Sequence, residues 1–216
     1  MPRSAIIAAL LVGVAALAWR FPLIHFSRLD RAVEAEASAK FDAAAFAERF
    51  WDHDLTPALA DAAELADVLP VLRSDPQAAC GKWGRSVGLS RSCLYLVRGR
   101  GVVSSVENSA VKIILDREKS GDVELATAMV FGSVVRDVTG RIDPAALADS
   151  RDLNQAATEI NRLVQERVIA KLKDQATEGA TVSFVACGQV QGKLVAGKPW
   201  KLIPLEVEVE GLKGRK

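Results

Sequence analysis

Apolar and polar residues alternate with a period of two along most of the second half of the chain, a pattern typical of β-strands. This alternation, together with many β-branched residues, predicts five strands, over residues 94–106, 109–116, 123–131, 181–190 and 200–210. Between the third and fourth strands, residues 153–172 carry apolar side chains three and four positions apart, which predicts an amphipathic helix. The predicted order is therefore three strands, a helix and two strands.

The OB-fold has this same order of elements: it is a five-stranded Greek-key barrel with its helix between strands three and four. Gly99 and Gly101 in the first predicted strand suit so small a barrel, because its strands must bend sharply. We therefore expect an α+β protein in which residues 93–212 form an OB-like five-stranded barrel of β-β-β-α-β-β order. A split α+β sandwich is the alternative.

Residues 27–72 have a helical pattern, and residues 28–92 are expected to form a helical neck and a connecting loop ahead of the barrel. Asp42 is a suitable N-cap for a helix over residues 43–52. A second helix is expected to begin at Thr56 and Pro57, because proline is favoured in the first turn of a helix.

Residues 5–19 contain no charged side chain and follow Arg3, as expected of a signal sequence or a membrane anchor. If the segment continues to Phe26, it forms a helix of about 33 Å, which is long enough to cross the hydrocarbon core of a bilayer. We therefore expect residues 1–27 to form a signal-anchor or transmembrane helix. Cleavage at the Ala-x-Ala site of residues 16–18, which would release a secreted protein, is one alternative, and a helix buried in protein is another.

Charges beside this segment bear on its orientation. Arg3 lies on one side and Arg20, Arg28 and Arg31 lie on the other, and Lys and Arg favour the cytoplasmic side of a membrane. A bacterial lipoprotein needs a cysteine directly after the apolar run, whereas the first cysteine here is Cys80. The charges alone argue against export of the domain, but the apolar segment itself favours export. We therefore expect a helical anchor in the bacterial inner membrane, without a lipid, and a globular domain in the periplasm. A domain that faces the cytoplasm is the alternative.

The charge balance argues against nucleic acid as a partner. The chain has 28 basic and 27 acidic residues, and its net charge is +1. Affinity for a polyanion depends on clustered Lys and Arg side chains that neutralise phosphates. The composition therefore favours other kinds of partner.

Three cysteines and two histidines limit the metal and redox chemistry of the chain. Cys80 and Cys93 bracket a loop rich in Gly, Arg and Ser, and in an oxidising compartment we expect them to form a disulfide. Cys187 lies in an apolar predicted strand and is expected to be buried as a small hydrophobic side chain. Because the sequence contains no Cys-x-x-Cys pair, we expect neither a metal site nor a cofactor.

The most polar group of neighbouring positions surrounds the start of the predicted long helix. The candidate ligand- or partner-binding residues are Arg136, Asp137, Arg151, Asp152 and Asn154. At the mouth of a barrel, such side chains would suit a polar small molecule or a peptide. The alternative is a solvated loop followed by an N-cap at Asp149 or Ser150. The sequence contains no hydrolase, phosphate-loop or dinucleotide motif, so we name no catalytic residue and do not expect an enzyme.

Short blocks in a shared order carry a resemblance to a known family. They are residues 41–43, 51–52, 95–103, 132–136, 151–152, 154–155, 160–161 and 200–207, together with Pro57 and Ala63. These blocks are similar to those of the domain of unknown function 2291 family (DUF2291), described as predicted periplasmic lipoproteins of bacteria. The resemblance covers about residues 28–210, but this chain lacks the lipid-bearing cysteine.

The resemblance implies a membrane-tethered protein outside the cytoplasm, in a family whose genes often neighbour those of sugar ABC transporters. No activity is established for that family, so the resemblance assigns no catalytic residue. We therefore expect a non-enzymatic periplasmic protein that binds a small polar ligand or a protein partner, such as a transporter component, as an accessory of sugar uptake. A carboxylate-dependent periplasmic hydrolase and a cytoplasm-facing binder of single-stranded nucleic acid are the alternatives.

Overall fold

The computed structural model describes residues 41–86, 92–115, 122–142, 147, 149–195 and 197–211. The membrane helix predicted for residues 1–27 and the first part of the predicted neck lie outside this part of the chain. Within the described ranges, no helix combines the length and the apolar composition that crossing a membrane requires.

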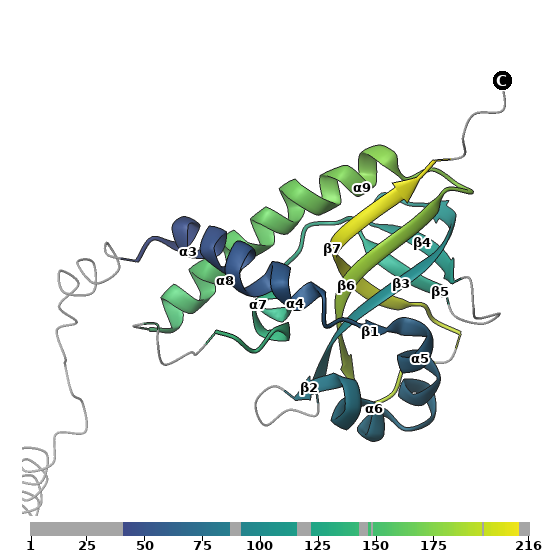
Figure 1. Cartoon of the computed structure of the whole chain (residues 1–216), viewed down its shortest axis with the longest axis horizontal. Helices are drawn as coiled ribbons and strands as arrows, with labels where there is room; N and C mark the ends of the chain where they lie inside the picture. The colour runs from purple at the N-terminus through teal and green to yellow at the C-terminus, as the bar shows by residue number, and fades with distance from the viewer. Residues whose placement is uncertain are drawn as a thin grey trace, which may run out of the picture. The chain divides into compact units, whose positions relative to one another are not determined.

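Five strands form the centre of the fold (Figure 1). They are β3 (Ser92–Val106), β4 (Ala110–Leu115), β5 (Asp122–Ala126), β6 (Thr181–Gln191) and β7 (Trp200–Glu210). Neighbouring strands pair in the order β3-β4-β5-β7-β6, and β6 pairs again with β3, so the hydrogen-bonded path closes on itself. β5 and β7 run parallel, whereas the other pairs along this path are antiparallel. Two short strands, β1 (Ala63–Glu64) and β2 (Gly84–Ser86), also pair with β3.

The strands lie close to where the alternating pattern predicts them, and the third one differs most. Residues 123–131 were expected to form this strand, but β5 ends at Ala126. The backbone N–H groups of Thr127 and Ala128 both donate to the carbonyl oxygen of Ser109, at 2.9 and 3.2 Å. These two bonds end the regular pairing with β4, and the chain then leaves the sheet.

One hydrophobic core fills the inside of the closed sheet. Tyr95 and Val97 of β3 belong to it, as do apolar residues of β4, β5, β6 and β7. Helices α5 (Leu65–Ser74) and α6 (Pro76–Trp83) contribute buried side chains to this core and lie at the lower end of the strands in Figure 1. Val168 and Leu172 add to it from the last part of the long helix, which passes the upper end.

A second core lies between the outer face of the sheet and a layer of helices. Leu94 belongs to it, although its neighbour Tyr95 belongs to the inner core, because successive side chains of a strand point to opposite faces. The helical layer consists of α3 (Ala43–Phe50), the π-helical turn η1 (Trp51–Leu55), α4 (Thr56–Leu59), α7 (Val134–Val138) and α8 (Ser150–Val164). Its buried residues include Phe50, Leu55 and Ile160.

This packing differs from the helical neck expected over residues 28–92. The described part of that segment contributes Phe50 and Leu55 to the outer core and Leu69 to the inner core. The first helix does begin as predicted, because the Asp42 Oδ1 accepts a hydrogen bond from the backbone N–H of Ala45 at 2.9 Å. From Phe41 onward, the helices are therefore part of the folded unit rather than a connector to it.

The predicted long helix extends beyond residues 153–172 at both ends. It comprises α8, the π-helical turn η3 (Gln165–Ile169) and α9 (Ala170–Gln175) without interruption. Asp149 caps its start, as one of the two expected N-cap positions, by accepting from the N–H groups of Arg151 and Asp152 at 2.7 and 2.9 Å. The π-helical turn was not predicted. Its extra residue leaves the apolar stripe of the helix continuous, so the sequence pattern gives no sign of the turn.

A disulfide joins Cys80 of α6 to Cys93 at the start of β3, with their Cα atoms 6.0 Å apart. This is the pair named from the sequence. Cys187 is free and completely buried in β6.

Candidate functional site

The structure divides the five residues of the predicted polar patch among three environments. Arg136 and Asp137 form an ion pair in α7: the Arg136 Nε donates to the Asp137 Oδ1 at 2.6 Å and Nη2 donates to Oδ2 at 3.1 Å. The Arg136 Nη1 also donates to the carbonyl oxygen of Leu153 at 3.0 Å. The two side chains are only 14 % and 20 % exposed. Because Leu153 lies in α8, the bond from Arg136 to its carbonyl oxygen joins α7 to α8.

The other three residues lie in the first turns of α8, beside the Leu153 carbonyl oxygen that Arg136 binds. Arg151 is exposed, whereas Asp152 is buried and its Oδ1 has no hydrogen-bond partner among the described residues. Asn154 is exposed and lines a cavity. Of the five predicted residues, Asn154 alone contributes to the site described next.

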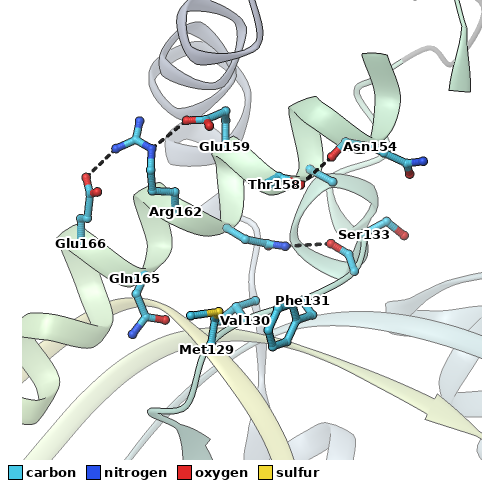
Figure 2. Close-up of a pocket in the computed structure, with 13 residues that line it drawn as sticks. Met129, Val130, Phe131, Ser133, Asn154, Thr158, Glu159, Arg162, Gln165 and Glu166 are labelled. Atoms are coloured by element: carbon cyan, nitrogen blue, oxygen red, sulfur yellow. Dashed lines mark hydrogen bonds and ion pairs between the residues drawn. The ribbon is translucent and has the colours of Figure 1, made fainter. Parts of the chain in front are cut away.

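This cavity has a volume of about 580 Å³ and lies between α8 and the segment that follows β5 (Figure 2). Residues 129–133 form one wall, and residues of α8 together with Gln165 and Glu166 of η3 form the other. Its size is within the range of pockets that hold small ligands.

The apolar wall presents two large side chains to solvent. Met129 is 69 % exposed and Phe131 is 76 % exposed, whereas Val130 between them is buried in the outer core. Gly132 then turns the chain with a φ of +83°, a conformation that favours glycine. The side-chain N–H of Asn161 donates to the Gly132 carbonyl oxygen at 2.8 Å, and this bond fixes the segment to α8.

The polar wall carries three charged side chains that pair with one another. Arg162 donates to Glu159 and to Glu166, at 2.7 Å in each case, and Figure 2 shows the three along one side of the helix. The hydrogen bonds to Glu159 and Glu166 raise the pKa of the Arg162 guanidinium above its ordinary value. Since both carboxylates are paired with the same arginine, this wall presents one net negative charge.

Gln165 supplies a hydrogen-bond acceptor that is not in use. Its side-chain Oε1 is buried and has no partner among the described residues. Gln165 is also the first residue of the π-helical turn, and such turns occur often at functional sites. A ligand with an apolar body and a hydrogen-bond donor would therefore match both walls of the cavity.

Sequence reasoning missed the residues that form this site. Met129, Val130 and Phe131 were assigned to the third strand. Because successive side chains of a strand point to opposite faces, both faces of the sheet would have had to bury large apolar side chains there. Three large apolar residues followed by Gly132 were the available signal of a segment outside the sheet. The spacing of Glu159, Arg162 and Glu166 fits helical ion pairs but does not indicate a cavity.

Metal-ligating side chains do not gather in the described part of the chain, where no group of three or more of them lies together. His53, one of the two histidines of the sequence, lies in η1 and is exposed.

Comparisons with known proteins agree with this architecture. The family model of DUF2291, described as a predicted periplasmic lipoprotein, matches residues 9–208. A crystal structure of an OB-fold protein from Thermotoga maritima superposes with a TM-score of 0.69 at 24 % identity, over 79 % of this chain and 99 % of that one. This likeness supports the α+β, OB-like fold predicted from the order of strands and helix. No curated protein matches the chain.

Proposed function

The chain belongs to the DUF2291 family of predicted periplasmic lipoproteins, and we propose that it is a non-enzymatic binding protein tethered to the inner membrane. The family description supports a location in the periplasm. The cavity beside α8 supports a binding role, because Met129 and Phe131 expose large apolar side chains at its wall. Exposed methionine and aromatic residues are typical of surfaces that bind partners.

The proposed tether is the apolar segment of residues 1–27 rather than a lipid. A bacterial lipid anchor needs a cysteine directly after the apolar run, whereas the first of the three cysteines in the sequence is Cys80. Cys80 and Cys93 are joined to each other. Cys187 is completely buried, and this burial raises the pKa of its thiol to about 12. Release by cleavage at residues 16–18 stays the alternative.

The ligand that this cavity favours has an apolar body and a hydrogen-bond donor. The apolar body would contact Met129 and Phe131, and the donor would reach the unpartnered Oε1 of Gln165. A segment of a partner protein and a small molecule both offer this chemistry. An accessory role in sugar uptake, with a transporter component as the partner, is the specific form of the proposal that the family resemblance implies.

The two alternative functions have less support from the site residues. For a carboxylate-dependent hydrolase, Asp137 is held in a two-bond pair with Arg136, and Glu159 and Glu166 are both paired with Arg162. For a nucleic-acid binder, a net charge of +1 supplies little attraction for phosphates.

Met129 provides a direct test, because the chain has only two methionines, Met1 and Met129. In protein labelled with [13C]methyl-methionine, we titrate indole, which has an apolar ring and an N–H donor, and benzofuran, which replaces that N–H by oxygen. We expect indole to shift the Met129 methyl signal in a saturable way and to bind about fivefold more tightly than benzofuran, the effect of one hydrogen bond.

Variants separate the two walls of the cavity. Phe131→Ser should weaken the binding of both probes, whereas Gln165→Leu should remove the higher affinity of indole relative to benzofuran. Val195→Ser is the matched control, because Val195 is 61 % exposed but does not line the cavity. A Met129 signal that does not respond to either probe, or that responds equally in the Phe131→Ser protein, would contradict the proposed site.

A further inference from the structure

A second cavity, of about 560 Å³, lies at the other end of the fold and has no part in the proposed function. It is bordered by α6, by β2 and by the adjoining ends of β3 and β6, which lie together at the lower end of the sheet in Figure 1. The disulfide between Cys80 and Cys93 lies in its wall, next to Tyr95 and Val190. The covalent bond holds α6 against β3, so this wall is fixed in place.

Tyr95, which lines this cavity, and Trp200, whose ring contacts that of Tyr95, each have a polar group that is buried without a hydrogen-bond partner among the described residues. Tyr95 lines the cavity and is 1 % exposed, and its hydroxyl has no partner among the described residues. The indole Nε1 of Trp200, which is 4 % exposed, also has none. The two rings meet edge to face, with their centres 5.5 Å apart. An unsatisfied buried donor is costly, so each group favours an acceptor that the described residues do not supply.

Two glycines leave the space that these rings occupy. A Cβ atom at Gly84 would come within 3.0 Å of the Tyr95 Cε1, and one at Gly188 would come within 2.9 Å of the Trp200 Cζ2. Gly84 and Gly188 both pair with Tyr95, one from each neighbouring strand. The missing side chains of these two glycines therefore leave room for the rings of Tyr95 and Trp200 against the backbone.

The lining of the cavity also limits the charge of what it can hold. The described residues that border it include Gln77, Ser86 and Tyr95 as polar side chains, and none of them is charged. Burial raises the pKa of Tyr95, so the hydroxyl stays protonated and can donate. Among these described side chains, a charged ligand would lose its hydration without gaining a partner of opposite charge.

We propose that this second cavity is a binding site for a small neutral molecule with a carbonyl, ether or hydroxyl oxygen that accepts a hydrogen bond from Tyr95. The apolar part of the ligand contacts Val190 and the disulfide. This site is separate from the cavity beside α8 and does not depend on the function proposed for that cavity.

Tyr95 is the one tyrosine of the chain, so a single resonance reports on this site. In protein labelled with [13Cζ]tyrosine, the chemical shift of that carbon follows the hydrogen bonding of the hydroxyl. We titrate three probes that share a six-membered ring: cyclohexanone, cyclohexanecarboxylate and cyclohexylammonium. Cyclohexanone is expected to shift the Tyr95 signal in a saturable way, and the two ions are expected to leave it unchanged at the same concentration.

Two variants make the test independent of the Tyr95 signal itself. Gln77 is exposed and borders the cavity, so Gln77→Trp should fill its mouth and abolish cyclohexanone binding, measured by calorimetry, without lowering Tm. Ala78→Trp is the matched control, because Ala78 is the next, also exposed, residue of α6 but does not border the cavity. Tyr95→Phe should weaken the binding of cyclohexanone about fivefold, as expected for one lost hydrogen bond.

The outcomes distinguish a ligand site from a hydroxyl that merely holds an internal water. A Tyr95 signal that does not change with cyclohexanone, equal binding in the Gln77→Trp protein, or equal binding of the charged probes would each overturn the proposal. The Met129 methyl signal reports on the other cavity, so failure at one site is distinguishable from failure at the other.

Discussion

Arg98 of β3 holds a helix end that lies 36 to 39 residues earlier in the chain. Its guanidinium donates to the carbonyl oxygens of Ala62 at 3.0 Å and of Leu59 at 2.9 Å, and also to that of Ala60. These carbonyls belong to the last turn of α4 and the residues after it, where a helix end leaves carbonyl oxygens short of donors, although that of Leu59 also accepts from the N–H of Ala62 at 3.3 Å. One side chain thus satisfies a helix end and fastens it to the sheet.

We expect Arg98→Met to lower the free energy of unfolding by about 2–3 kcal/mol, because bonds to a charged donor are lost and part-buried carbonyls lose their partner. Arg98→Lys should recover about half of that loss, since an ammonium group cannot reach carbonyls in the planar arrangement of a guanidinium. Urea unfolding measures both. Arg151→Met, at an exposed position of α8, is the control and should change stability by less than about 0.5 kcal/mol. An equal loss in the two methionine variants would show that the bonds of Arg98 are not the cause.

At this scale, sequence reasoning succeeded where a residue acts on its neighbours and failed where its partner is distant. Asp42 and Asp149 cap helices that begin directly after them, so the local pattern was sufficient to name them. Arg98 binds backbone carbonyls, which carry no residue-specific signal in the sequence. The candidate residues Arg136 and Asp137 were named because they are charged, and a pattern of charges does not say whether they pair with each other.

Helix α6 depends on the disulfide more than on its own packing. Ala79 is its one completely buried side chain among the described residues, so α6 contributes little apolar surface to the inner core. The disulfide between Cys80 and Cys93 closes a loop of sequence separation 13 and joins α6 to β3. In the chain-entropy account, such a bond restricts the unfolded chain and stabilises the folded one.

Replacing Cys80 and Cys93 together by alanine is expected to lower the free energy of unfolding by about 2–3 kcal/mol, the usual effect of a loop of this length. Urea unfolding with and without dithiothreitol measures the change. Reductant should shift the midpoint of the native protein and leave that of the double variant where it is. Equal midpoints for the native protein under both conditions would contradict this account.

Long helices and strands, in which the apolar pattern repeats several times, were predicted well, and short ones were predicted poorly. β7 has the bounds predicted from its alternation, which is clearest at its end, where Val207 is buried between the exposed Glu206 and Glu208. α7 was missed in what was expected to be a polar connection, because five residues show only Val135 and Val138 as a buried pair. The third strand was extended too far, because Met129 and Phe131 satisfy the strand pattern although no neighbouring strand pairs with them.

The whole molecule from Phe41 onward is built around one closed sheet with a core on each of its faces. The order of strands and helix was enough to predict the inner arrangement, because few topologies connect these elements in this order. The outer layer could not be predicted, because the apolar stripes of α3 and α8 show that each helix is buried but not what it is buried against. The helices expected to form a neck therefore proved to cover the sheet. The first cavity lies between α8 and the segment after β5, and the second lies where α6 meets the sheet.

The location of the whole chain determines whether its disulfide forms, and this relation gives a test of the proposed compartment. Disulfides persist in the periplasm and are rare in the cytosol. In bacteria that express the full chain, we trap thiols with acid, denature the protein and add a maleimide-linked polymer that slows migration on a gel. A periplasmic domain should show one reactive thiol, that of Cys187, because Cys80 and Cys93 are joined. A cytoplasmic domain should show all three.

Deleting residues 1–27 supplies the matched control for this thiol count. That variant lacks the segment proposed to direct export, so it should stay in the cytosol and show three reactive thiols, whereas the full chain should show one and remain in the membrane fraction. The opposite result for the full chain, three thiols in the membrane fraction, would mean that Arg20, Arg28 and Arg31 had placed the domain in the cytoplasm, since positive flanks favour that side. The wall of the second cavity would then lack its covalent bond, and the periplasmic binding role would be wrong.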